Sequence, residues 1–153
     1  LLGQVLTLAE DGRVTEEQAA LVLPRTDMDF VAQLFDALIR KDASAGIMVV
    51  NNLVREGVQV QRFTQNALEF FRKALLLKLN SQLAMFSSLE LSKEHEQQLL
   101  QHIENVDVGY LERMIRVFLS RAEEPNVTNL PQLPLEMAIV ELTIGSTDTF
   151  SLL

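Results

Sequence analysis

The 153-residue chain contains no cysteine. Disulfide frameworks, zinc ribbons, iron–sulfur clusters and thiol catalysis all need cysteine sulfur, so the composition excludes each of them. The absence is also compatible with a reducing compartment. We expect a cytoplasmic protein, although the lack of cysteine does not by itself establish that location.

Basic residues and long apolar runs are scarce as well. Thirteen lysines and arginines are outnumbered by 21 aspartates and glutamates, which gives a net charge of −8. Binding that neutralises many phosphates needs the opposite balance, so we expect no direct nucleic-acid contact. No apolar run approaches the roughly 18 residues that would cross a bilayer, so we expect no membrane segment.

Glycine and histidine occur in patterns that match no known cofactor motif. None of the six glycines precedes a lysine, and they are scattered singly, so both the phosphate-binding loop and the dinucleotide fingerprint are missing. The two histidines, His95 and His102, lie on one predicted helix, about 10 Å apart along its axis. They cannot share one ion, and the side chains one turn away offer no carboxylate. We predict no catalytic, cofactor-binding or metal-binding residue in this chain.

Apolar side chains at helical spacing are what the chain contains instead. From Asp29 to Lys41 they fall in pairs three to four residues apart, as in an amphipathic helix. Asp42 to Ser44 can begin a second helix, and Gly57 is placed to end it in a left-handed conformation. Residues 61–79 are apolar on more than one face. That segment should be the most buried helix, or be shared between the core and a partner.

The second half of the chain continues the pattern with one irregular segment and one break. Residues 80–91 have no clear periodicity and are expected to be a helix end plus a loop. Ser92 and Asp107 can each cap a helix, three prolines interrupt residues 123–134, and a last apolar helix begins near Pro134. No stretch alternates apolar and polar residues as a strand does. We predict an all-α globular bundle of about seven to eight helices.

The first 22 residues have the pattern of two short helices around Asp11-Gly12. Pro24 interrupts that pattern, and Thr26 or Asp27 can cap the helix that follows. The best domain boundary therefore lies within residues 23–27.

Three stretches, in order along the chain, resemble the γ/τ subunit of the bacterial DNA polymerase III clamp loader. Residues 12–18 look like the turn of its lid domain. Residues 57–63, followed by 70–78, look like the family's G-x-x-x-x-R-F … LLLLK pattern, and residues 131–142 look like its closing helix. The resemblance implies that residues 1–24 end the lid domain, 25–144 form the helical collar domain, and 145–153 are a tail leading into a further segment.

The same resemblance implies a part of a machine without chemistry of its own. In this family an upstream ATPase module binds ATP and zinc, so no cofactor is expected here. The collar domains of five subunits associate into a ring that holds the loader together while the sliding clamp is loaded onto DNA. The implied partners are other γ/τ copies, the delta and delta-prime subunits, and the χψ pair through ψ.

Apolar coverage and arginine clusters indicate where such contacts could form. We select Phe70, Phe71 and Leu75 on the most apolar helix, with Arg113 and Arg116, as the possible subunit interface, because arginine is enriched at interfaces. One alternative is an all-α ligand-binding regulatory or dimerisation domain, which needs an enclosed apolar cavity of about 300 Å³ or more. A metal-dependent helical enzyme is a third hypothesis and needs clustered ligands.

Overall fold

Residues 26–124 and 128–145 are described by the structure, a computed structural model, and the regular elements in these two ranges are all helical. The prediction of an all-α fold is confirmed. The two short helices predicted within the first 22 residues lie outside the described ranges. The described elements are α3 (Asp27–Ile39), α4 (Ala43–Arg55), α5 (Val60–Leu79), the 3₁₀ helix η1 (Ser81–Phe86), α6 (Lys93–Ile103), α7 (Val108–Ala122), α8 (Leu133–Val140) and the π-helical turn η2 (Glu141–Gly145).

Short polar side chains begin four of these helices. Thr26 caps α3 in a reciprocal capping box: its Oγ1 accepts from the Asp29 N–H at 3.2 Å, and its own N–H donates to Asp29 Oδ2 at 2.9 Å. Asp42, Ser92 and Asp107 cap α4, α6 and α7, each with a side-chain oxygen that accepts a hydrogen bond from one backbone N–H of the first turn. All four satisfy backbone N–H groups that the first helical turn leaves unpaired.

Helices α3 and α4 end in the same left-handed turn. Gly57 has φ +85°, and the N–H of the next residue, Val58, donates to Leu53 O at 3.0 Å. The glycine end of α4 is therefore confirmed. Lys41 occupies the equivalent position after α3 with φ 56°, and the Asp42 N–H donates to Ala37 O at 2.9 Å. The sequence does not predict this turn, because lysine rarely adopts a positive φ.

The expectation of a helix end plus a loop over residues 80–91 misses η1: α5 ends at Leu79 and residues 87–92 have no regular structure, but residues 81–86 form a 3₁₀ helix. Asn80 ends α5 in an extended conformation, and its side chain accepts from the Gln82 N–H at 3.0 Å. None of the six η1 side chains is buried. Since no side chain of η1 is buried, its sequence has no apolar periodicity that would predict a helix.

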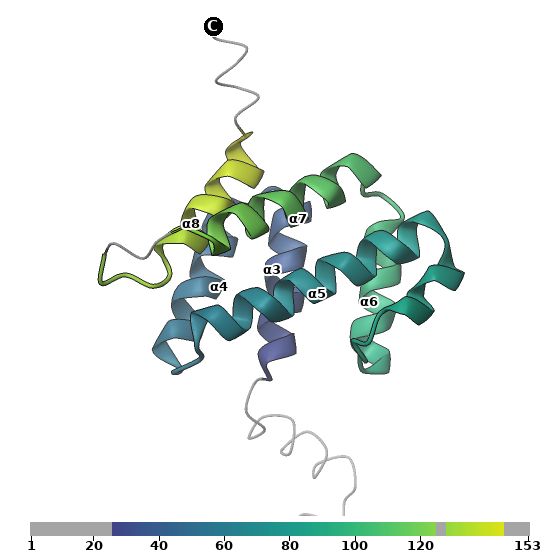
Figure 1. The fold of residues 1–153 in the computed structure, drawn as a ribbon, viewed down its shortest axis with the longest axis horizontal. Coiled ribbons are helices and arrows are strands. Elements are labelled where there is room, and N and C mark those ends of the chain that lie inside the picture. Colours follow the sequence, from purple (N-terminus) through teal and green to yellow (C-terminus); the bar gives the residue numbers. More distant parts are fainter. Residues whose placement is uncertain (1–25, 125–127, 146–153) are drawn as a thin grey trace, which may run out of the picture.

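Helix α5 packs against both α3 and α7 and carries the centre of the core. In Figure 1 it crosses in front of α3, with α7 beside it. Phe70 meets Phe35 of α3 edge to face, with ring centroids 5.1 Å apart. Phe71 meets Phe118 of α7 in the same way at 5.0 Å. Each such pair adds about 0.5–1.5 kcal/mol to the stabilisation from buried area. Phe71 also lies beside Phe35, with ring centroids 6.0 Å apart. The two adjacent phenylalanines therefore join α5 to both α3 and α7.

Two close contacts attach the C-terminal helix to this core. A Cβ on Gly46 of α4 would lie 2.9 Å from Ile139 Cγ2 of α8, so only glycine allows the two helices this approach. The Tyr110 hydroxyl on α7 lies 2.8 Å from Leu38 O and 3.0 Å from Leu142 O, which ties α3, α7 and η2 together. Burial of this hydroxyl raises the pKa of Tyr110 to about 12, although nearby Arg113 opposes the shift.

The position of Phe71 predicts a large effect of its removal on stability. Phe71→Ala should lower the free energy of unfolding by about 3–5 kcal/mol, because a fully buried ring is replaced by a cavity. Phe86→Ala, which truncates a phenylalanine that is 65% exposed, is the matched control and should change it by less than about 0.5 kcal/mol. Urea titration at low protein concentration measures both, and equal effects would contradict the assignment.

Candidate interaction surfaces

The structure corrects the sequence-based choice of Phe70 and Phe71 as interface residues. Their exposed fractions are 1% and 0%, and both rings belong to the core of this chain. The sequence showed that residues 61–79 are apolar on more than one face, but not which neighbours cover those faces. Helices α3 and α7 of the same chain cover them.

The other three predicted interface residues occupy different surroundings. Leu75 is half-buried against the core. Arg113 is also half-buried, and its Nη2 donates to Glu141 O at 3.1 Å. Arg116 is exposed and pairs with Glu112 one turn earlier, a hydrogen bond that raises the pKa of its guanidinium. Whether these three residues contact a neighbour stays a prediction.

Two adjacent apolar side chains of η1, Met85 and Phe86, project from the surface, and we name this pair the η1 knob. Their exposed fractions are 79% and 65%. Arg72 Nη1 donates to Phe86 O at 3.3 Å, and Lys73 Nζ donates to Leu89 O at 2.7 Å. Two cations from α5 therefore hold the last residue of η1 and the segment that follows it against that helix. The apolar ends of the knob face solvent.

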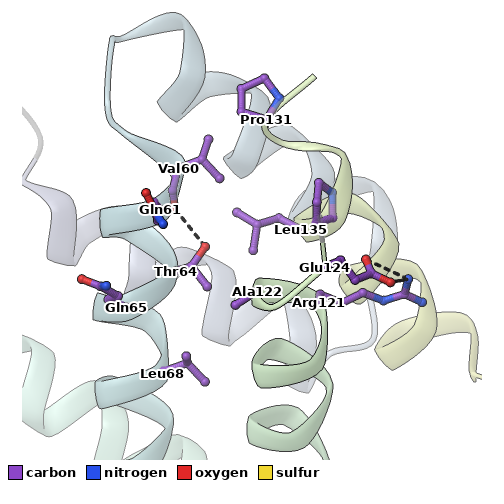
Figure 2. Close-up of a pocket in the computed structure, with 11 residues that line it drawn as sticks. Val60, Gln61, Thr64, Gln65, Leu68, Arg121, Ala122, Glu124, Pro131 and Leu135 are labelled. Atoms are coloured by element: carbon purple, nitrogen blue, oxygen red, sulfur yellow. Dashed lines mark hydrogen bonds and ion pairs between the residues drawn. The ribbon is translucent and has the colours of Figure 1, made fainter. Parts of the chain in front are cut away.

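A hollow of about 440 Å³ opens between α5, the end of α7 and the start of α8, and we name it the α5 hollow. Figure 2 shows side chains of the first two turns of α5 on one side and those of α7 and α8 on the other. Apolar and polar groups line it together: Val60, Gln61, Thr64, Gln65, Leu68, Arg121, Ala122, Glu124, Pro131, Pro134 and Leu135.

Arg121 is held in place at the edge of the α5 hollow by two carboxylates. Its Nη1 lies 3.1 Å from Glu124 Oε2 (Figure 2), and its Nη2 lies 2.9 Å from Glu141 Oε1. The hydrogen bond to Glu141 is the main reason that the pKa of Arg121 is raised. Because its charge is already compensated, this arginine is not a free anion-binding group.

Each histidine of α6 pairs with an aspartate of α3. His95 Nε2 lies 2.9 Å from Asp29 Oδ1, and His102 Nε2 lies 3.3 Å from Asp36 Oδ1. The seven-residue spacing is the same on both helices, so two parallel contacts join α3 to α6. The sequence of α6 alone does not predict these two pairs, because each aspartate lies 66 positions before its histidine, on another helix. They line a second, open hollow of about 610 Å³.

Hydrogen bonding favours the ionised form of Asp29. Partial burial opposes ionisation, but the Thr26 backbone N–H, the Thr26 hydroxyl and His95 together hold the pKa of Asp29 below its usual 3.8. Asp29 thus supports both the cap of α3 and the contact with α6.

Residues 26–124 and 128–145 contain neither a cluster of metal ligands nor a membrane-spanning helix. No group of three or more histidine, aspartate or glutamate side chains in these ranges could hold a metal ion. No helix there is long and apolar enough to cross a membrane.

Comparison with protein-family models gives a match. The family model described as DNA polymerase III subunits gamma and tau domain III matches residues 14–148 of the chain. No curated protein and no solved structure matches it.

The lowered pKa of Asp29 predicts a pH-dependent effect of its removal. Ionisation of Asp29 favours the folded state, so its contribution is complete above the unfolded-state pKa near 3.8 and is lost as the pH falls through the lower folded-state pKa. Asp29→Asn should therefore destabilise the chain at pH 7, and the difference from wild type should shrink below about pH 4. Thermal unfolding followed by circular dichroism between pH 7 and pH 2.5 measures it.

Glu90→Gln is the control for this experiment. Glu90 is exposed and forms no ion pair with any residue in the described part of the chain. Its substitution should leave the melting temperature unchanged at pH 7. A difference for Asp29→Asn that stays constant across the pH range would contradict the role given to Asp29.

Proposed function

The chain belongs to the family of domain III of the DNA polymerase III gamma and tau subunits and is therefore a clamp-loader subunit domain, and we propose that its role is to hold the subunits of the loader together. The match over residues 14–148 carries the proposal, because it covers all of the described fold. Domain III of the clamp loader is a non-catalytic helical domain. Its contribution is therefore binding energy and geometry.

The exposed apolar side chains support a role in assembly. Besides the η1 knob, large apolar residues are exposed on several other elements: Met48 on α4, Leu79 on α5, Leu100 on α6, Leu119 on α7, Leu130 before α8, Met137 on α8 and Ile144 on η2. Single exposed apolar residues are common in monomers, but a pair such as Met85 and Phe86 marks a contact site more often.

The proposed partners are other clamp-loader subunits. They are further gamma or tau copies, delta and delta-prime, and the χψ pair bound through ψ. We assign no cofactor and no nucleic-acid contact to this chain, and we place it in the cytoplasm. A ring of such domains needs two different contact faces on each copy, because neighbours in a ring meet head to tail.

The geometry gives less support to a ligand-binding regulatory domain. Such a domain needs an enclosed apolar cavity. The α5 hollow and the hollow beside His95 both open to solvent, and polar side chains contribute to each lining.

The assembly role predicts a change in mass on mixing. The chain has a mass of 17.2 kDa, and light scattering after size exclusion should show larger species when the delta and delta-prime subunits of the same organism are added. An unrelated acidic helical protein of similar size is the control for non-specific association. Elution of the chain at the monomer mass in every mixture would contradict the proposed function.

A further inference from the structure

The η1 knob and the α5 hollow are two unlike features placed toward opposite ends of α5. Figure 1 shows η1 beside the C-terminal part of α5, whereas residues at the start of α8 line the hollow together with the N-terminal part of α5. The hollow uses α5 residues 60–68, and no residue of η1 lines it. Because α5 is one continuous helix packed on both sides, it fixes the spacing between the two features. The knob of a copy therefore cannot enter the hollow of the same copy.

The two features match in size and apolar character. Methionine and aromatic residues are enriched at protein interfaces, and an aromatic anchor that fills a pocket is the usual form of a binding hot spot. Val60, Leu68 and Leu135 give the α5 hollow apolar walls, and its volume of about 440 Å³ leaves room for a phenylalanine and a methionine side chain. Gln61 and Gln65 at its edge can bond to the polar backbone around an inserted knob.

The charges around the two features are of opposite sign. Arg72 and Lys73 beside the knob donate to backbone carbonyls, and neither forms an ion pair with a carboxylate in the described ranges. Around the hollow, one arginine, Arg121, is shared by two carboxylates, Glu124 and Glu141, which leaves one excess negative charge, and the adjacent Glu123 adds another. Arg62, next to Gln61 on α5, is paired with Asp27 at 3.0 Å.

Local complementarity matters here because the copies repel each other overall. A net charge of −8 on each chain disfavours non-specific association. A contact that brings the basic side of one copy to the acidic side of the next replaces part of that repulsion by attraction. Two knobs, or two hollows, would instead bring like charges together.

We propose that the η1 knob of one copy seats in the α5 hollow of the next copy, so that copies of this chain join head to tail. The inference rests on the proposed function and specifies which two faces make the contact. Because the faces differ, each added copy presents one free knob and one free hollow, as a ring or an open row of subunits requires.

Engineered disulfides test the contact directly, because the chain has no cysteine of its own. A Phe86→Cys copy is mixed with a Gln65→Cys copy under mild oxidation, and both substitutions are at exposed positions. The cross-linked dimer between the two copies should exceed, several-fold, the 86–86 and 65–65 dimers formed by either variant alone. The matched control pairs Phe86→Cys with Met48→Cys, which is exposed on α4 and lines neither hollow.

The cross-linking has clear contradicting results. Equal yields for all pairs, a dominant 86–86 dimer, or no cross-link between positions 86 and 65 would each overturn the head-to-tail contact. If such a result is obtained while the wild-type chain still binds delta and delta-prime, the proposed function holds and only this contact fails. If the chain binds no clamp-loader subunit, the proposed function fails first.

A mixing experiment tests the same contact without cross-linking. Phe86→Asp removes the knob and Gln65→Lys adds a positive charge at the hollow, and each alone should weaken self-association about tenfold or more in sedimentation velocity. An equimolar mixture should recover dimers and nothing larger, because one intact knob can still meet one intact hollow. Unchanged association of either variant, or no recovery on mixing, would contradict the proposal. Far-ultraviolet circular dichroism verifies that both variants fold.

Discussion

Covering the apolar faces of α5 is the constraint on which the rest of the fold depends. The helix presents phenylalanines toward two directions, and only a helix on each side removes them from water: Phe35 of α3 meets Phe70, and Phe118 of α7 meets Phe71. The remaining elements are positioned by contacts with the helices that these two ring pairs join. The tight approach at Gly46 places α8 against α4, and the Tyr110 hydroxyl joins α3 and η2 to α7. The candidate contact surfaces, the α5 hollow and the η1 knob, lie near the two ends of α5.

The features that the sequence predicted correctly are those decided within a few residues. Ser92 and Asp107 cap helices as predicted, because their short polar side chains reach backbone N–H groups two or three residues ahead. Thr26 and Asp42 do the same, where the sequence had offered Thr26 or Asp27 and the stretch from Asp42 to Ser44. Gly57 ends α4 because only glycine adopts a positive φ without cost. The all-α class follows from apolar spacing alone. The family resemblance, confirmed by the match to residues 14–148, rested on motifs of the same local kind.

The features that could not be predicted depend on which helices meet. From the sequence, Phe70 and Phe71 were predicted to contact a partner, because the sequence does not show that α3 and α7 cover them. The carboxylates opposite His95 and His102 come from α3, so no search along α6 could find them. The α5 hollow combines residues from α5, α7 and α8 and exists only after these helices pack. Together these results move the candidate interface from the middle of α5 to its ends.

Hydrogen–deuterium exchange of the chain, alone and assembled with other clamp-loader subunits, tests this view most directly. Backbone amides around Phe70 and Phe71 should exchange slowly in both states, because the core is complete within one chain. Assembly should add protection at η1 and at the walls of the α5 hollow, residues 60–68 and 131–135. Protection gained around Phe70 and Phe71, with η1 and the hollow unchanged, would contradict the claim that this domain is joined through the ends of α5.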